Sequence, residues 1–227
     1  MTKFFYEGWE LKYFDKANNF RKYQFDLLKK NIKGFVAEVG PGNGSFLDYY
    51  CNLADTIDLY EPSKNFLSVL EKKQTPNINI INSYFSEKKE MYNTILYLDV
   101  LEHIENDLNE IDIAFNSLKP GGALIFNVPA FQHLYSQFDK DVKHFRRYSK
   151  TDLTSKIQKF KFSKINCFYY DSLGYFLSLA SRLFTKNYLN NFDKKIKIWD
   201  SLIPLSKIID LFIFNRFGKS LIMICIK

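Results

Sequence analysis

The sequence predicts an α/β fold in which a doubly wound, mostly parallel sheet of seven strands has helices on both faces and an antiparallel last strand. Three observations lead to this prediction. Short apolar runs alternate with helical patterns between residues 34 and 170. A strand hands over to a helix through a glycine-rich turn, GPGNG, at 40–44. The last apolar run, at 220–226, follows a helical stretch too long for a hairpin turn, which we interpret as an insertion before an antiparallel last strand.

The chain of 227 residues is long enough for one α/β domain with additions, but short for two domains. We therefore expect a single domain. Its parts are an N-terminal helical lid at 1–33, a core at 34–170 that contains most of the sheet, a helical cap insertion at 171–219 and the last strand at 220–227.

Composition narrows the class of protein. The chain is 46% hydrophobic and contains 23 Phe and 15 Tyr, which predicts a large ordered core. Cys51, Cys167 and Cys225 are too scattered for a disulfide framework or a CxxC metal site, so we expect buried thiols in a reducing compartment. Charged residues interrupt the apolar ones near Met1, so we expect no leader and a cytoplasmic protein. The net charge of +7 comes mainly from scattered lysines, which does not favour nucleic acid as a partner.

The N-terminal segment at 1–33 has aromatic residues at helical spacing, which predicts two amphipathic helices that lie over the site. Tyr6, Trp9 and Tyr13 are candidates for contact with an acceptor molecule. The alternative, that they only cover the sheet, is equally open.

The first core strand, at 35–39, and the helix at 45–53 flank the glycine turn. A glycine-rich turn at this place is typical of a dinucleotide site, but three residues argue against a pyrophosphate. Pro41 lacks an N–H donor, Ser45 stands where the third glycine of a dinucleotide motif would fall, and Glu38 would repel phosphate. A ligand with a cationic sulfonium and an ammonium suits these residues better. S-adenosylmethionine (SAM) is such a ligand.

The next elements follow in the order of a doubly wound sheet: a second strand at 57–60, a helix at 62–72, an edge-like third strand at 77–82 and a fourth strand at 94–98. Glu61 ends the second strand, at the distance from the glycine turn where an acid reaches the hydroxyls of a ribose. Asp99 ends the fourth strand.

Four features of the sequence, in the expected order, resemble motifs of the Rossmann-like, class I SAM-dependent methyltransferases: VAEVGPGNGSF at 36–46, the acid Glu61, LDVLEHI at 98–104, and LKPGGALIFNVPA at 118–130. The resemblance implies a Rossmann-like core, SAM as cofactor, S-adenosylhomocysteine as product, and methyl transfer to an oxygen or nitrogen of a small molecule. It also implies that the following residues contact the cofactor: Glu38, Gly40, Pro41, Gly42, Asn43, Gly44, Glu61, Ser83, Tyr84, Asp99, Val100 and Leu101.

A helical pattern with an apolar stripe follows from Glu102 to Lys119. We expect its polar residues to face outward: Glu105, Asp107, Asn109, Glu110 and Asp112.

Asp99, Glu102 and His103 lie before this helix, where side chains can face the transferred methyl group. His103 could act as a general base, or it could serve in packing and capping, and both interpretations stay open. In relatives that methylate phenolic quinone precursors, an acid followed three residues later by Glu-His binds a divalent cation, and the present spacing resembles theirs. A quinone or phenol O-methyltransferase is therefore kept as an alternative, although we expect no metal.

The segment FQHLYSQFDKDVKHFRRYSKTDL, at 131–153, resembles a group of small bacterial methyltransferases associated with cell-surface polysaccharide or related sugar pathways. Its adjacent Arg146 and Arg147 could hold a carboxylate or phosphate through forked hydrogen bonds, or one could pair with Asp139 or Asp141. We expect an anionic acceptor, such as a sugar nucleotide, a sugar acid or a lipid-linked glycan precursor. The residues expected to bind it are Tyr13, Tyr135, Arg146, Arg147 and Tyr148, and those expected to take a hydroxyl proton are His103 and His144.

The remaining elements are a helix at 152–160, a sixth strand at 162–170 and insertion helices at 173–184 and 196–214. Charged residues interrupt every run in the insertion that approaches a membrane span. The first interpretation of the insertion is a cap over the acceptor pocket. The second is peripheral membrane contact through residues 192–217, because Lys194, Lys195, Lys197 and Trp199 precede an apolar stretch.

Three other functions remain for comparison. A nucleic-acid methyltransferase acting on an exocyclic base amine would have an Asn/Asp-Pro-Pro-aromatic stretch after the fourth strand, which this chain lacks at 99–102. Pro41 and Ser45 disfavour a nicotinamide oxidoreductase. A non-enzymatic, SAM-binding partner subunit would keep the same cofactor motifs and stays open as an alternative.

Overall fold

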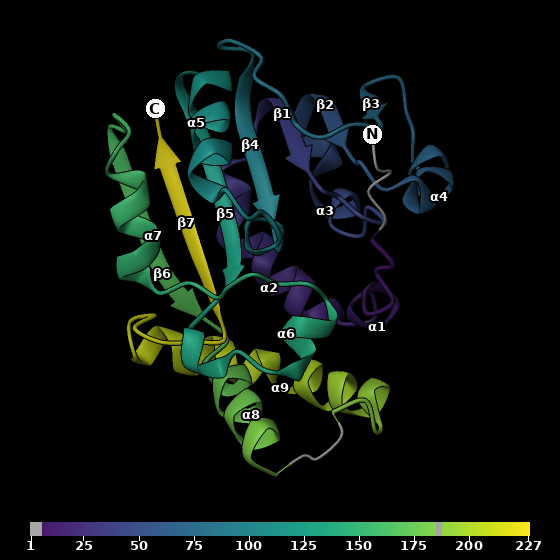
Figure 1. Ribbon diagram of the computed structural model, residues 1–227, viewed down its shortest axis with the longest axis vertical. Coiled ribbons are helices and arrows are strands. Elements are labelled where there is room, and N and C mark those ends of the chain that lie inside the picture. Colours follow the sequence, from purple (N-terminus) through teal and green to yellow (C-terminus); the bar gives the residue numbers. More distant parts are fainter. Residues whose placement is uncertain (1–5, 185–187) are drawn as a thin grey trace.

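The computed structural model describes residues 6–184 and 188–227 and contains one sheet flanked by helices (Figure 1). The strands are β1 (Gly34–Val39), β2 (Ala54–Tyr60), β3 (Ile78–Ile81), β4 (Tyr92–Leu98), β5 (Leu118–Pro129), β6 (Lys164–Tyr170) and β7 (Ser220–Ile226). Their order in the sheet is β3-β2-β1-β4-β5-β7-β6. Strand β7 runs antiparallel to β5 and β6, and the other neighbours are parallel. The predicted fold class is confirmed.

The helices are α1 (Leu11–Phe14), α2 (Asn18–Leu28), α3 (Leu47–Tyr50), α4 (Leu67–Glu71), α5 (Asp107–Ser117), α6 (Gln137–Asp141), α7 (Lys150–Ile157), α8 (Ser172–Phe184) and α9 (Phe192–Phe212). Helices α2, α3 and α9 pack on one face of the sheet, and α5 and α7 pack on the other (Figure 1). The side chains of neighbouring strand residues point to opposite faces of the sheet, so Val36 and Ala37 of β1 belong to the cores on its two sides. Because both faces are covered, the central strands are nearly continuous apolar runs.

Three predicted helices are shorter in the structure. Residues 45–53 form only α3 and a 3₁₀ turn at Cys51–Leu53, and residues 62–72 form a 3₁₀ turn and α4. The helix expected from Glu102 begins at Asp107, because Leu101–His103 forms a separate 3₁₀ turn. Asn106 caps α5, since its side chain accepts a hydrogen bond from the Asn109 N–H at 3.2 Å.

Asp107 is buried, and the expectation that it faces outward is wrong. The Tyr148 hydroxyl donates to its Oδ2 at 2.8 Å. Lys156 Nζ lies 2.8 Å from Oδ1, and Arg146 Nη1 lies 2.9 Å from Oδ2. These partners come from distant parts of the chain, so helical periodicity alone does not reveal them.

The insertion between β6 and β7 forms α8 and α9, which lie at one end of the molecule (Figure 1). A buried carboxylate of α9, Asp210, joins it to the core. It accepts hydrogen bonds from the N–H groups of Asp171 at 2.7 Å and Ser172 at 2.9 Å, and from the Tyr23 hydroxyl at 2.9 Å. Asp210 therefore caps α8 and ties both insertion helices to α2. Within the two described ranges, no helix is both long and apolar enough to cross a membrane.

Replacing Asp210 by Ala should lower the free energy of unfolding by about 3 kcal/mol, because buried donors lose their acceptor. Chemical denaturation measures this change. The matched control is Asp193→Ala on the same helix, which removes only exposed ion pairs with Lys16 and Lys197 and should unfold like the parent. Equal denaturation midpoints for Asp210→Ala and the parent would show that this junction does not stabilise the insertion.

Candidate functional site

A cavity of about 1400 Å³ opens at the carboxyl ends of β1, β2, β4 and β5. It lies where the order of strands reverses, beside β1 and β4, which is the usual ligand site of an open α/β sheet. Tyr6 and Glu10 of the N-terminal segment line it, and so do residues of α8 and α9. The cavity therefore joins the ends of the strands to two segments outside the sheet.

The turn after β1 has a backbone conformation that favours glycine. Gly40 and Gly42 have φ values of 65° and 55°. A Cβ atom at Gly40 would lie 2.9 Å from a methyl group of Val100, and one at Gly42 would lie 3.0 Å from a methyl group of Leu11. The absence of side chains leaves the backbone of this turn open to close approach by a ligand.

Glu61 lies beside this turn, at the end of β2. Its carboxylate is buried and accepts hydrogen bonds from the Gly42 N–H at 2.9 Å and the Ser63 N–H at 2.8 Å. Burial raises the pKa of Glu61, and the two N–H donors oppose the rise. The result is a positioned carboxylate on the cavity wall next to the glycine turn.

Two further acids line the same part of the cavity. Glu38 is buried and accepts a hydrogen bond from the Tyr50 hydroxyl at 2.6 Å. Burial raises the pKa of Glu38 to about 7, although the Tyr50 hydrogen bond and the charge of Arg21 oppose the rise. Asp99, with a φ of 57°, accepts a hydrogen bond from the Asn127 amide at 2.8 Å. The end of the cavity near β1 and β4 is thus rich in carboxylates.

Arg21 of α2 is a functional candidate that the sequence analysis missed. Its Nη1 lies 4.0 Å from Asp99 Oδ2 and donates to Gln24 at 3.0 Å. Its Nε is buried without a hydrogen-bond partner among the described residues. The available signal was its rarity, since the lysine-rich chain contains few arginines, but no spacing rule places α2 against the end of β1.

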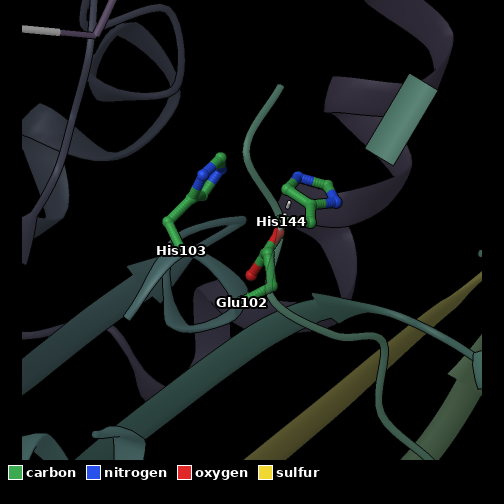
Figure 2. A group of neighbouring side chains, drawn as sticks. All are labelled: Glu102, His103 and His144. Carbon is green, nitrogen blue, oxygen red and sulfur yellow. Dashed lines mark ion pairs between the residues drawn. The ribbon is translucent and has the colours of Figure 1, made fainter. Parts of the chain in front are cut away.

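Glu102, His103 and His144 converge in another part of the cavity (Figure 2). The first two belong to the 3₁₀ turn after β4, and His144 follows α6. The two imidazole rings lie edge to face with centroids 4.6 Å apart. One ligand atom from each of the three residues lies within 4.8 Å of the others, so this trio could hold a metal ion. His144 takes the place that the spacing of the sequence suggested for Asp99.

The ionisation of this trio follows from its burial. Glu102 is fully buried, and neither carboxylate oxygen has a hydrogen-bond partner within the described parts of the chain. Burial and the charge of Asp99 raise the pKa of Glu102 well above its usual value, which favours the neutral form of this carboxyl group. Burial, with the nearby His144, lowers the pKa of His103 to about 3, so this ring is neutral.

Asp139 orients the His144 ring. Its Oδ1 lies 2.9 Å from His144 Nδ1, which leaves His144 Nε2 at 3.8 Å from Glu102 Oε1. Arg147 donates two hydrogen bonds to the same carboxylate, at 2.8 and 3.0 Å. Burial would raise the pKa of Asp139, but the hydrogen bonds from His144 and Arg147 outweigh burial and lower it. When Nδ1 is the donor, His144 Nε2 keeps a lone pair on the side of Glu102.

A model of the methyltransferase domain family matches residues 12–166, which include the glycine turn, Glu61 and the trio. The chain belongs to this family of enzymes. No curated protein matches the sequence.

Three solved structures resemble the methyltransferase. Phosphoethanolamine N-methyltransferase 2 of Haemonchus contortus, solved with SAM, has a TM-score of 0.65 and 14% identity, over 96% of this chain and 57% of its own. A SAM-dependent methyltransferase of Archaeoglobus fulgidus has a TM-score of 0.63 and 11% identity, over 96% of this chain and 100% of its own. A possible histamine N-methyltransferase of Thermotoga maritima has a TM-score of 0.63 and 15% identity, over 98% and 94%. At these identities the likeness shows the fold.

Most predicted cofactor contacts of the methyltransferase lie on the cavity wall: Glu38, Gly40, Pro41, Gly42, Asn43, Glu61, Tyr84, Asp99 and Val100. Three others are placed elsewhere. Gly44 faces Leu70, exposed Ser83 donates to the Tyr84 carbonyl, and Leu101 is buried in the core.

The predicted acceptor and catalytic residues divide in the same way. His103, His144 and Arg147 line the cavity, whereas Tyr13, Tyr135, Arg146 and Tyr148 do not. The Tyr135 hydroxyl donates to the His144 carbonyl at 2.7 Å, and Tyr13 packs edge-on against Phe192.

The expectation that Arg146 and Arg147 face the acceptor needs correction, because both guanidinium groups form ion pairs with carboxylates of the protein. Arg147 is forked onto Asp139. Arg146 pairs with Asp107 at 2.9 Å and also donates to the Glu105 carbonyl at 2.9 Å. Two arginines in such pairs are compensated without any ligand.

Proposed function

We propose that this methyltransferase transfers the methyl group of SAM to an oxygen or nitrogen of a small-molecule acceptor and releases S-adenosylhomocysteine. One observation supports the proposal above all others: a single cavity contains both the glycine turn with its flanking acids and the Glu102, His103 and His144 trio. Donor and acceptor molecules can therefore meet in one space. Methyl transfer depends mainly on such alignment of the nucleophile with the methyl carbon.

The donor would occupy the part of the cavity near β1, β2 and β4. In this proposal Glu61 accepts hydrogen bonds from the two ribose hydroxyls, since each of its oxygens already receives one N–H and retains a second lone pair. Glu38 and Asp99 face the ammonium and sulfonium groups. The methionine end of SAM also has a carboxylate, and we assign it to Arg21, whose buried Nε points to a missing acceptor.

The acceptor nucleophile would lie near the imidazole of His144. Its hydroxyl proton passes to His144 Nε2 while the oxygen attacks the methyl carbon, and the electron pair of the breaking S–C bond stays on sulfur. The negative charge of Asp139 stabilises the imidazolium that forms. The neutral His103 ring packs against Tyr6, with centroids 5.3 Å apart, and encloses this space.

We also propose that the acceptor is anionic, of the sugar-nucleotide, sugar-acid or lipid-linked glycan type. Arg146 and Arg147 are paired within the protein. An anionic acceptor is supported instead by Arg182 of α8 and Lys195 of α9, which line the part of the cavity formed by the insertion. Phe14, Phe138 and Phe192 line the same cavity, an environment that also suits a quinone or phenol. The scattered positive charge also supports a partner other than nucleic acid.

Calorimetry with SAM and detection of S-adenosylhomocysteine test this function. Sugar nucleotides, lipid-linked glycans and phenols serve as three classes of acceptor. Gly42→Ala is the control, because a side chain at a φ of 55° and 3.0 Å from Leu11 should prevent SAM binding while the melting temperature stays close to that of the parent. Absence of SAM binding to the parent, or equal binding to the variant, would refute the proposed donor site.

The affinity for SAM should rise with pH, because the cationic cofactor favours the ionised form of Glu38, whose pKa is raised to about 7. Between pH 6 and 8 the ionised fraction of such a group grows about tenfold, and the association constant should follow it. Glu38→Gln should flatten this dependence.

The same pKa has the opposite effect on the ligand-free protein. The folded state binds this proton more tightly than the unfolded state, so folding stability should fall as pH rises from about 4.5 to about 7. Denaturation of parent and Glu38→Gln across this range checks the sign. If Glu38→Gln retained the pH dependence of SAM binding, another acid would be responsible for that dependence.

Replacing His144 by Gln should lower turnover about a hundredfold and leave the Kd for SAM unchanged, because the variant loses the proton acceptor and keeps the donor site. His133→Gln is the matched control, since His133 bonds Tyr175 outside the cavity and should keep parent activity. A metal chelator should have no effect. Activity that the chelator abolishes and added Zn²⁺ restores would show that His144 acts as a ligand and not as the base.

A further inference from the structure

Helix α9 has two apolar faces. Ile196, Trp199 and Ile203 belong to its inner face and pack in the core. On its outer face, Leu205 and Ile208 are each about half exposed, at 50% and 53%. A surface helix normally has one apolar face, which packs on the core, and one polar face, which contacts solvent. The outer apolar residues of α9 therefore need an explanation beyond the packing of this chain.

The apolar outer face continues past the end of the helix. Leu211, Phe212 and Phe214 are 66%, 79% and 77% exposed, and they follow the outer residues of α9 along the chain. Phe214 and Asn215 both have positive φ values, 54° and 53°, in the turn that leads toward β7. Single exposed apolar residues are common, but five large ones on a helix and its following turn form an exposed patch. We call these five residues, Leu205, Ile208, Leu211, Phe212 and Phe214, the outer α9 patch.

The exposed charges around this patch are mostly positive: Lys194, Lys197, Lys207 and Arg216. Asp193, at the start of α9, is already paired with Lys16 and Lys197. Asp200 and Asp210 are buried on the inner face. The neighbouring Asp26 of α2 is shared among Lys22, Lys29 and Lys207. Because two acids are shared among five lysines, the border of the patch keeps a net positive charge, and apolar side chains with such a border match the boundary of an anionic membrane.

The same charges disfavour a second copy of the chain as the occupant. A twofold contact through this patch would bring Lys207 and Arg216 close to their own copies, with the acids of α9 turned inward. The protruding rings of Phe212 and Phe214 also suit a deformable acyl layer better than a flat protein surface.

We propose that the outer α9 patch binds the surface of an anionic lipid bilayer, with its apolar side chains at the level of the acyl chains and the flanking cations at the headgroups. The helix lies in the plane of the surface and does not span the bilayer. Helices α8 and α9 also line the cavity, through Leu177, Phe192 and Trp199 among others. An acceptor held in the lipid would therefore approach the proposed active site from this side. The binding itself does not depend on methyl transfer.

Sedimentation with vesicles tests the proposal on the full chain. Vesicles of phosphatidylcholine with about one third phosphatidylglycerol should bind the protein, pure phosphatidylcholine vesicles should bind it weakly, and added salt should reduce the difference. The triple variant Leu211→Ser, Phe212→Ser, Phe214→Ser should lose at least about tenfold in the partition coefficient, because it removes apolar groups that would enter the bilayer.

The matched control is Leu53→Ser with Ile165→Ser, which replaces exposed apolar residues away from the insertion and should bind like the parent. Thermal melts establish that both proteins are folded, and the Kd for SAM of the triple variant should equal that of the parent. Equal partition of the triple variant and the parent overturns the proposal. So does a parent dimer, seen by light scattering, that the triple variant converts to a monomer without any effect of vesicles on either protein.

Discussion

The buried carboxylate of Asp139 holds the proposed acceptor end of the cavity together. It is fully buried and accepts hydrogen bonds from Arg147, from the Ser136 N–H at 2.8 Å and from the His144 ring. An ionised carboxylate in such surroundings is strongly destabilising unless it is paired, and the forked guanidinium provides the pairing. Because the same carboxylate orients the imidazole, the fold of this loop and the direction of His144 Nε2 depend on one ion pair. A change at Arg147 would therefore disturb the imidazole even without touching the acceptor.

The two ends of the cavity differ in how rigidly they are held. Apart from Arg21, the proposed donor end consists of backbone and carboxylates at the ends of neighbouring parallel strands, where Gly42 donates a hydrogen bond to Glu61. The acceptor end is assembled from segments that are far apart in the sequence, including Tyr6, the 3₁₀ turn Leu101–His103 and His144. A family with one cofactor can keep the first end constant and vary the second. This difference explains why the fold and the family say much about the donor and little about the acceptor.

The same difference limits what sequence reasoning can predict. Strands of a parallel sheet are continuous apolar runs followed by turns, so β1, β2 and β4 and the acids at their ends could be read directly. The inward orientation of Asp107 could not, because helical periodicity describes a helix without its neighbours. Its contacts with Arg146 and Tyr148 form only when the segment after β5 folds back over α5. The spacing of Asp99, Glu102 and His103 likewise suggested a local trio, whereas the structure brings in His144 from that same returning segment.

The insertion places a second demand on the sequence of α9. Its inner face must satisfy buried polar groups, since Asp200 accepts the N–H of Phe20 at 2.9 Å and Asp210 caps α8. These acids face the core, whereas five large apolar side chains are exposed on the outer face and the following turn. A helix that only covers a sheet would present polar residues on its outer face. Burying carboxylates requires specific partners, and exposing apolar residues weakens the hydrophobic contribution to folding, so neither feature follows from stability alone. Contact with lipid is a physical reason for the exposed apolar residues of α9. The hydrogen bonds of the buried Asp200 and Asp210 hold this surface in a fixed orientation to the cavity.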